Sequence, residues 1–351
     1  MKYKIILTAG IASLLFGCKT AEQYPLMEGS TENVDWRQVE PIDTTPQNKK
    51  AVRFKITDQF LQTPNIVRRD PSDVINVDGT YYVWYTKITS DTKGYPEGWG
   101  GTVWYATSKD GHKWTEKGEA VSRGPKKSWD GYGTYTPNVI EFNGKYYLGY
   151  TAMPDPFIRK VSQAQIGIAV ADSPNGPWRR VSDKPSIAVG ESTQQVDSFL
   201  VDDTVFVVNN DRIYLYYKGF PKWKDENGKD MRNKVHSTFM TFSVADTPAG
   251  PYKKHHKPLL RAHEIIAWKA AKDKINSMSI GWGKFLLYES KNGIDFFAKH
   301  PLKLNEGNFG LRAAGFYRKD LTGNHEPARP NWGICMANGG LARFEIIWPK
   351  K

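Results

Sequence analysis

Acidic and acid–base side chains occur at three places just before alternating apolar stretches: Asp70, the Asp202-Asp203 pair and His263-Glu264. A protonated carboxyl group can donate a proton to a leaving oxygen, and an ionised carboxylate can activate a water molecule. A histidine between carboxylates becomes a cation, which is a usable proton donor near neutral pH. Hydrolysis of a glycosidic bond needs two such groups on opposite sides of the bond. Each residue alone also fits a turn cap or a structural role, so their shared position in a repeat is what favours a site.

The elements that would position these residues repeat with a spacing of roughly 65 residues. Each opening stretch is an alternating apolar run, a turn and a second run, and two of the turns are Asp78-Gly79 and Asn143-Gly144. Such dipeptides between alternating runs are a strong signal for a β-hairpin. A second hairpin follows, ending on an aromatic residue, as in residues 103–114 and 168–178. Two hairpins make one four-stranded antiparallel blade of a propeller.

The repeat predicts an all-β fold, a five-bladed β-propeller of four-stranded antiparallel blades, over residues 51–351. Three units open at Asp70, Thr136 and Asp203, and weaker fourth and fifth copies lie near His263 and Arg329. The strand expected at residues 52–56 would complete the last blade and close the ring. Because the innermost strands of a propeller line its channel, the five openings should converge at one end of the axis. An immunoglobulin-like sandwich would have fewer strands and no such period.

The N-terminus predicts a bacterial lipoprotein. Two lysines precede an apolar stretch at residues 5–16, which is too short to span a bilayer as a mature helix. Leu15-Phe16-Gly17-Cys18 resembles a lipoprotein cleavage box, so residues 1–17 are expected to be a signal peptide and Cys18 the lipidated residue. Polar residues 18–50 would tether the domain to the bacterial cell envelope. Cys335 then has no partner for a disulfide and is expected in the core.

Composition favours a carbohydrate ligand. The chain has 12 Trp, 18 Tyr and 16 Phe, and aromatic rings suit both strands and the apolar faces of sugars. The net charge of +12 has no accompanying nucleic-acid motif, and a basic surface favours an anionic, for instance sulfated, glycan. No metal-ligand spacing, glycine-rich phosphate loop or serine nucleophile elbow is present. We therefore expect an oligosaccharide partner, no nucleic acid, no required cofactor, and membrane contact through the lipid alone.

Several motifs resemble glycoside hydrolase family 117, which belongs with the family 43-like five-bladed propellers. They are Arg68-Arg69-Asp70-Pro71, the run 214–219, the run 171–178, and His263-Glu264 followed by Trp268. The resemblance extends from about residue 60 to the C-terminus. It implies an exo-acting, inverting α-1,3-(3,6-anhydro)-L-galactosidase that acts on red-algal galactan oligosaccharides, as in agar or carrageenan degradation.

The resemblance also implies roles for individual residues. Asp70 corresponds to the general base and His263 to the general acid, with Glu264 tuning or positioning it. Asp203 corresponds to a third acid, but Thr204 replaces the usual proline, so Asp202 and Asp203 both stay open. The substrate-binding candidates are Arg69, Thr136, Asp202, Lys218, Trp268 and Arg329.

Two family features do not carry over directly. Many members exchange an N-terminal helix-turn-helix within a dimer, but residues 19–50 contain prolines and little apolar periodicity, so the oligomeric state stays open. Some members hold a divalent cation near the site, but no ligands can be assigned to one here.

Two other interpretations fit the sequence. One is family 43-type specificity, an α-L-arabinofuranosidase or β-xylosidase, with Glu264 itself as the general acid. The other is a non-catalytic, surface glycan-binding lipoprotein.

Overall fold

The structure is a computed structural model that describes residues 44–92, 99–222, 224, 227–229, 238–281, 284–304, 314–323 and 329–350. The described residues form strands, turns and loops, with no helix among them, as the sequence predicted. This part of the chain therefore contains no helix that could cross a membrane. The predicted signal peptide, Cys18 and most of the predicted tether lie outside the described residues, and residues 47 and 48 hydrogen bond to the backbone of Ala298 and Lys299.

The strands belong to four sheets. The first has the order β2-β4-β5-β6, with β3 also pairing with β4. Its strands are β2 (Ile66–Arg69), β3 (Ile75–Val77), β4 (Thr80–Thr89), β5 (Thr102–Ser108) and β6 (Trp114–Val121). The second, of order β10-β9-β8-β7, contains β7 (Gly133–Phe142), β8 (Lys145–Met153), β9 (Gln165–Ala171) and β10 (Arg179–Arg180). The third contains β11 (Leu200–Asn209), β12 (Arg212–Phe220), β13 (Phe239–Ala245) and β14 (Lys253–Arg261) in chain order.

The fourth sheet has eight strands in the order β15-β16-β17-β18-β1-β21-β20-β19. These are β15 (Glu264–Ala271), β16 (Lys274–Gly281), β17 (Lys284–Ser290), β18 (Phe296–Leu304), β1 (Val52–Phe60), β21 (Gly340–Ile347), β20 (Trp332–Ala337) and β19 (Ala314–Phe316). β1 pairs antiparallel with β21 and parallel with β18, with Val52 opposite Leu302. The strand expected at residues 52–56 therefore joins the final strands of the chain, as predicted.

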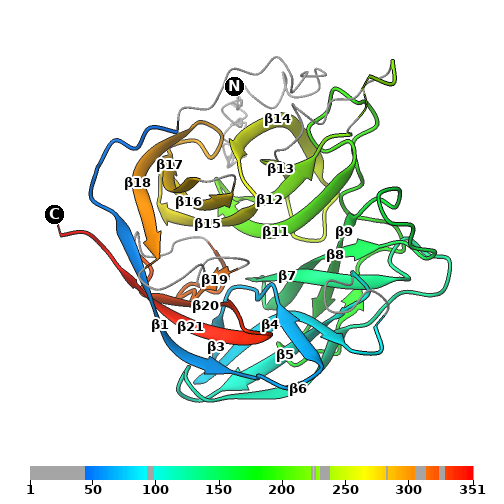
Figure 1. Cartoon of the computed structure of the whole chain (residues 1–351), viewed down its shortest axis with the longest axis horizontal. Helices are drawn as coiled ribbons and strands as arrows, with labels where there is room; N and C mark the ends of the chain where they lie inside the picture. Colours follow the sequence, from blue (N-terminus) through cyan, green and yellow to red (C-terminus); the bar gives the residue numbers. More distant parts are fainter. Residues whose placement is uncertain are drawn as a thin grey trace, which may run out of the picture.

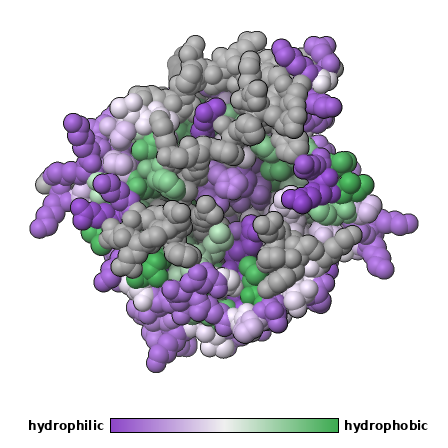
Figure 2. Space-filling model, viewed as in Figure 1, coloured by the Kyte–Doolittle hydropathy of each residue, from purple (hydrophilic) through white to green (hydrophobic). Residues whose placement is uncertain are grey.

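The sheets are arranged around a common centre in a propeller-like fold. The strands at the inner edges of the sheets are β7, β11, β15 and β19, and in the first sheet β2 and β3, which both pair with β4 (Figure 1). Seen from the same direction, hydrophilic side chains occupy the middle of the molecule (Figure 2). The innermost strands therefore place polar groups around the axis.

Turn chemistry and burial explain the individual sheets. The φ values are 49° for Asp78 and 72° for Gly79 in one turn, and 52° for Asn143 and 74° for Gly144 in the other. Positive φ at both residues is the geometry of a tight hairpin turn, which the short polar residue and the glycine tolerate. Apolar side chains between neighbouring sheets form the core, for example Trp84 with Val139 and other members of one buried cluster.

A buried ion pair crosses the centre. Arg318 Nε lies 2.6 Å from Asp73 Oδ2, and both side chains are 3% exposed. Asn138 Nδ2, on β7, also donates to Asp73 Oδ2 at 3.0 Å. Arg318 Nη2 donates to the backbone oxygens of Phe206 on β11 and Ala267 on β15, each at 3.1 Å. This network therefore connects the first, second and third sheets with both halves of the eight-stranded sheet.

Candidate active site

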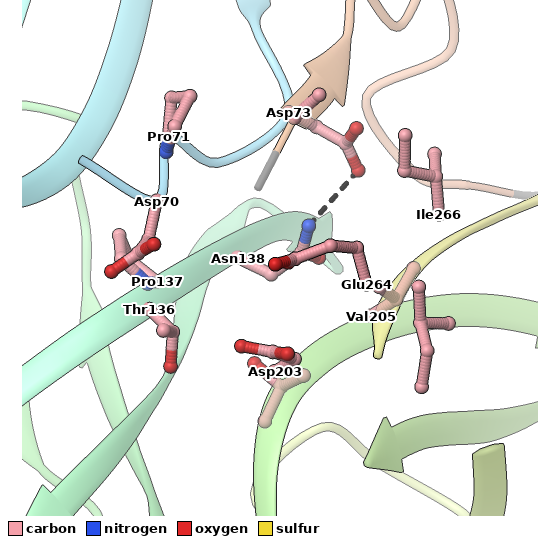
Figure 3. A pocket seen from close by; sticks show the side chains of 13 residues that line it. Asp70, Pro71, Asp73, Thr136, Pro137, Asn138, Asp203, Val205, Glu264 and Ile266 are labelled. Atoms are coloured by element: carbon pink, nitrogen blue, oxygen red, sulfur yellow. Dashed lines mark hydrogen bonds between the residues drawn. The ribbon is translucent and has the colours of Figure 1, made fainter. Parts of the chain in front are cut away.

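An open cavity lies at one end of the centre, and its empty space, counted together with the open solvent at its mouth, is about 410 Å³. Four carboxyl-bearing side chains contribute to its lining (Figure 3), namely Asp70, Asp73, Asp203 and Glu264. The remaining lining residues are Pro71, Thr136, Pro137, Asn138, Thr204, Val205, Ile265, Ile266 and Ala314. Residues from five innermost segments therefore meet at one polar cavity, and four of these segments, those of Asp70, Thr136, Asp203 and Glu264, are openings that the repeat predicted.

The backbone is unusual where three of these segments open. Asp70, Thr136 and Asp203 have φ values of 51°, 46° and 54°. A left-handed conformation is rare for residues other than glycine and is an outlier for a β-branched residue such as threonine. Strain of this kind costs about 1–3 kcal/mol per residue and is concentrated at functional sites. The shared conformation supports the interpretation that the three positions serve the cavity together.

Asp70 follows β2 directly and is 6% exposed. Its Oδ2 atom accepts hydrogen bonds from Arg69 Nε at 2.7 Å and from Thr86 Oγ1 at 3.3 Å. The Thr86 hydroxyl in turn accepts the backbone N–H of Thr136 at 2.9 Å. The negative charge of Asp70 raises the pKa of Arg69, so this guanidinium remains a cation beside the carboxylate.

The structure distinguishes Asp202 from Asp203, which the sequence left open. Asp203 lines the cavity, whereas Asp202 does not. Asp202 Oδ1 instead accepts hydrogen bonds from Thr136 Oγ1 at 3.0 Å and Thr151 Oγ1 at 2.7 Å. Lys218 Nζ lies between the two acids, 3.2 Å from Asp202 Oδ2 and 2.6 Å from Asp203 Oδ2. Asp203 is therefore the acid that faces the cavity.

The two acids differ in proton affinity. Burial raises the pKa of Asp203 well above its ordinary value, and the nearby Asp202 carboxylate adds to this effect. Burial also acts on Asp202, but Lys218 and the Thr151 and Thr136 hydroxyls outweigh it and lower its pKa. Asp202 is therefore the ionised partner of Lys218, and Asp203 holds its proton more tightly.

Glu264 and His263 lie at the start of β15 but in different environments. Glu264 lines the cavity, and its side chain is 14% exposed. Burial, together with repulsion from Asp70 and Asp202, raises its pKa to about 7, although Lys218 opposes the change. His263 does not line the cavity, its side chain is 53% exposed, and its Nε2 atom lies 3.6 Å from Glu264 Oε1. The geometry therefore places Glu264, and not His263, in the cavity wall.

Of the six substrate-binding candidates, only Thr136 lines the cavity; Arg69 and Asp202 do not, and the other three also lie away from it. Trp268 lies four positions beyond Glu264 on β15, and only 2% of it is exposed. Its ring packs edge-on against Phe316 in the core. Lys218 is buried between the two aspartates. Arg329 is exposed and its Cζ lies 5.7 Å from the ring of Trp348. The last unit opens at β19, where Ala314 lines the cavity, so the opening predicted at Arg329 was wrong.

Sequence reasoning missed Asp73 and Asn138. Asp73 is three residues after Asp70, and Asn138 is two residues after Thr136. Both therefore lie just after the opening of a repeat unit, and this position could have marked them as candidates. Their importance depends on Arg318, whose contact with Asp73 Oδ2 is a feature of the folded chain alone.

A divalent cation does not fit the acids of this site well. In the described part of the chain, no group of three or more His, Cys, Asp or Glu side chains is arranged to hold a metal ion. Arg69 and Lys218 already lie beside Asp70 and Asp203 and supply positive charge there.

Comparisons with known proteins identify the class of enzyme. The model of glycosyl hydrolases family 43 matches residues 63–231. A solved family 117 glycoside hydrolase produced by the marine bacterium Zobellia galactanivorans has a TM-score of 0.71 and 28% identity, covering 84% of this chain and 90% of that chain. This chain is a glycoside hydrolase. The resemblance to family 117, within the family 43-like group, is thereby confirmed.

More distant solved structures share only the fold of this glycoside hydrolase. An endo-arabinase from Bacteroides thetaiotaomicron is 15% identical, with a TM-score of 0.56 and coverage of 84% of this chain and 98% of its own. Fructan 1-exohydrolase IIa from Cichorium intybus is 14% identical, with a TM-score of 0.55 and coverage of 83% and 57%. No curated protein sequence matches the glycoside hydrolase.

Proposed function

We propose that the protein is an inverting exo-glycosidase that removes a terminal 3,6-anhydro-galactose, α-1,3-linked, from red-algal galactan oligosaccharides. The observation that carries the mechanism is the cavity with Asp70 on one side and Glu264 on the other (Figure 3). A carboxyl group with a pKa of about 7 keeps much of its proton near neutral pH, as a general acid must. The likeness to the family 117 enzyme supports the substrate.

In the proposed reaction, the Asp70 carboxylate removes a proton from a water molecule while the water oxygen bonds to the anomeric carbon. The bond from that carbon to the leaving oxygen breaks, and Glu264 gives its proton to the leaving oxygen. Attack from the face opposite the leaving group inverts the anomeric configuration. Asp203, holding its proton, donates a hydrogen bond to a sugar hydroxyl. Arg69 holds Asp70 Oδ2 through its Nε atom and offers its remaining N–H groups to the substrate.

The choice of Glu264 as acid revises the sequence prediction, in which His263 donates the proton. We expect Glu264→Gln to lower kcat on a natural oligosaccharide by about 10²–10⁴-fold, the usual contribution of a general acid. On a glycosyl fluoride, whose leaving group needs little protonation, the loss should be far smaller. His263→Ala should retain activity within severalfold. The opposite pattern, with His263→Ala inactive and Glu264→Gln active, would return the donor role to His263.

The substrate is tested by incubating residues 19–351 with neoagaro-, carrageenan- and arabino-oligosaccharides. We expect release of a single terminal sugar from a galactan oligosaccharide, appearing first as the anomer opposite to the linkage. Sulfated and unsulfated galactan fragments would show whether the net charge of +12 selects anionic substrates. The family 43 match and the position of Glu264 also favour a second candidate, an α-L-arabinofuranosidase or β-xylosidase. Release of arabinose or xylose alone would select it.

We further propose five blades and a lipid anchor. The parallel pairing of β1 with β18 supports a division of the eight-stranded sheet into two groups of four, which with the other sheets makes five. An experimental structure of the full ring tests this count. The sequence around Cys18 supports lipidation in the bacterial envelope. Cys18→Ala should then move the protein from the membrane fraction and abolish fatty-acid labelling.

A further inference from the structure

Lys218 and Asp202 form a buried pair behind the wall of the cavity. Lys218 is 6% exposed, and neither residue lines the cavity. We propose that both are positioning residues, a mutually neutralising pair that fixes Asp203 in the wall and sets the charge felt by Glu264 across the cavity. Lys218 then acts through Asp203 and Glu264, and does not bind the sugar as the sequence predicted.

The contacts of Asp202 show why its negative charge cancels the positive charge of Lys218. Its Oδ1 atom accepts three hydrogen bonds, from the hydroxyls of Thr136 and Thr151 and from the backbone N–H of Asp203 at 2.9 Å. Its Oδ2 atom faces the Lys218 ammonium group. A carboxylate with this many donors stays ionised. The charge of Lys218 is thus compensated by Asp202, while its other side holds Asp203 Oδ2 at 2.6 Å.

Glu264 lies among charges of both signs, so its proton affinity reports on the pair. Lys218 lowers its pKa, whereas Asp202 raises it. The titratable and charged groups that surround this part of the cavity are Arg69, Asp70, Asp73, Asp202, Asp203, Lys218 and His263, with Tyr135 buried beside the aspartates. Removing the Lys218 ammonium group should therefore raise the pKa of Glu264, and removing the Asp202 carboxylate should lower it. Removing both should leave it close to its original value.

The experiment compares Lys218→Met, Asp202→Asn and the double variant in the full chain. The apparent pKa of Glu264 is measured by NMR titration of ¹³C-labelled glutamate side chains, with Glu264→Gln identifying the signal. We expect a rise of about one unit or more in Lys218→Met, a fall in Asp202→Asn, and a return to within about half a unit in the double variant. The alkaline limb of the activity profile should move in the same directions, and KM of the double variant should stay within about threefold of the parent.

A matched control is the pair of Lys254 and Asp197, which lie 2.6 Å apart with side chains 18% and 1% exposed. Neither residue lines the cavity. Lys254→Met removes the same kind of charge and should leave the pKa of Glu264 in place. Equal shifts in this control and in Lys218→Met would show a general loss of structure and overturn the proposal.

Other outcomes also decide against it. Shifts of the same sign in both single variants, or no return in the double variant, would overturn the charge-balance role. A large rise in KM in the double variant would show direct sugar contact by Lys218. If Lys218→Met fails to fold, two measurements still test the proposal. They are the direction of the Glu264 pKa shift in Asp202→Asn, and the return of that pKa toward the parent value in the double variant. The inference rests on the proposed function only for the activity profile, because the NMR titration gives its answer even in a protein that cleaves none of the sugars tested.

Discussion

Glu264 is pulled in opposite directions by its surroundings, and the outcome is a carboxyl group that holds its proton in the folded chain. Burial raises its pKa to about 7 from an ordinary 4.5, with Asp70 and Asp202 adding to the rise and Lys218 opposing it. The unfolded chain releases that proton at a lower pH. Between about pH 4.5 and pH 7, the folded state therefore binds more protons than the unfolded state, and the contribution of Glu264 to stability declines as pH rises.

The corresponding prediction concerns the melting temperature as a function of pH. Glu264→Gln cannot ionise, so it should gain stability relative to the parent as pH rises through this window, by about 1–3 kcal/mol at pH 8. Below pH 4.5 the two proteins should differ little. Thermal unfolding of both at a series of pH values measures the difference. A constant difference at all pH values would mean that Glu264 titrates alike in the folded and unfolded chains.

At the same scale, the sequence located most of the acids but could not assign their orientation. Asp70, Asp203 and Glu264 all line the cavity, and each opens a repeat unit. Periodicity places a residue on a strand but does not say which of two adjacent acids faces inward. Lys218 illustrates the difficulty, because its role depends on two aspartates on the neighbouring strand, with which it pairs across the sheet.

At the scale of the element, the innermost strands are joined through Arg318 and Asp73. Breaking a buried pair by neutralising one partner typically costs about 3–5 kcal/mol, because it leaves the other charge uncompensated. We expect this loss for Asp73→Asn, measured by urea unfolding. Lys145→Ala is the control, since Lys145 pairs with Asp172 at 3.1 Å with side chains 50% and 71% exposed. Such a surface pair contributes at most about 1 kcal/mol. Similar losses in the two variants would contradict a central role for Asp73.

Turn signals explain which elements could be predicted. Asp78-Gly79 and Asn143-Gly144 lie in hairpin turns where the sequence placed them. The opening of the last unit was misplaced because its inner strand, β19, has only three residues, too few to show alternation. Arg329 precedes β20, whose apolar sequence has a clearer signal. Short strands held by tertiary contacts leave little trace in periodicity.

At the scale of the whole molecule, β1 joins the two ends of the chain. It lies between β18 and β21, and its residues Val52 and Phe54 are 0% and 3% exposed. Loss of β1 would leave two strand edges unpaired and expose an apolar surface, which favours aggregation.

Two truncations test this role. A chain that begins at residue 44 should unfold cooperatively at nearly the parent melting temperature. A chain that begins at residue 61 lacks β1 and should lose stability, by about 1.5–3 kcal/mol for each large apolar side chain no longer buried. Thermal unfolding and light scattering compare the two. Equal stability would mean that the contacts of β1 add nothing to the ring.

The position of β1 also bears on the order in which the protein can fold. Arg53 pairs with Ile347 and Val52 with Leu302, so the first described strand meets both of its partners only after most of the other described strands have been made. During synthesis β1 emerges before its partner strands and stays unpaired, while the intervening hairpins can form locally as they emerge. Pairing between segments so distant in sequence is slow because a long loop must close before any contact forms. Closure of the ring should therefore be the last step, and until then the edges of β18 and β21 are the surfaces a chaperone would need to shield.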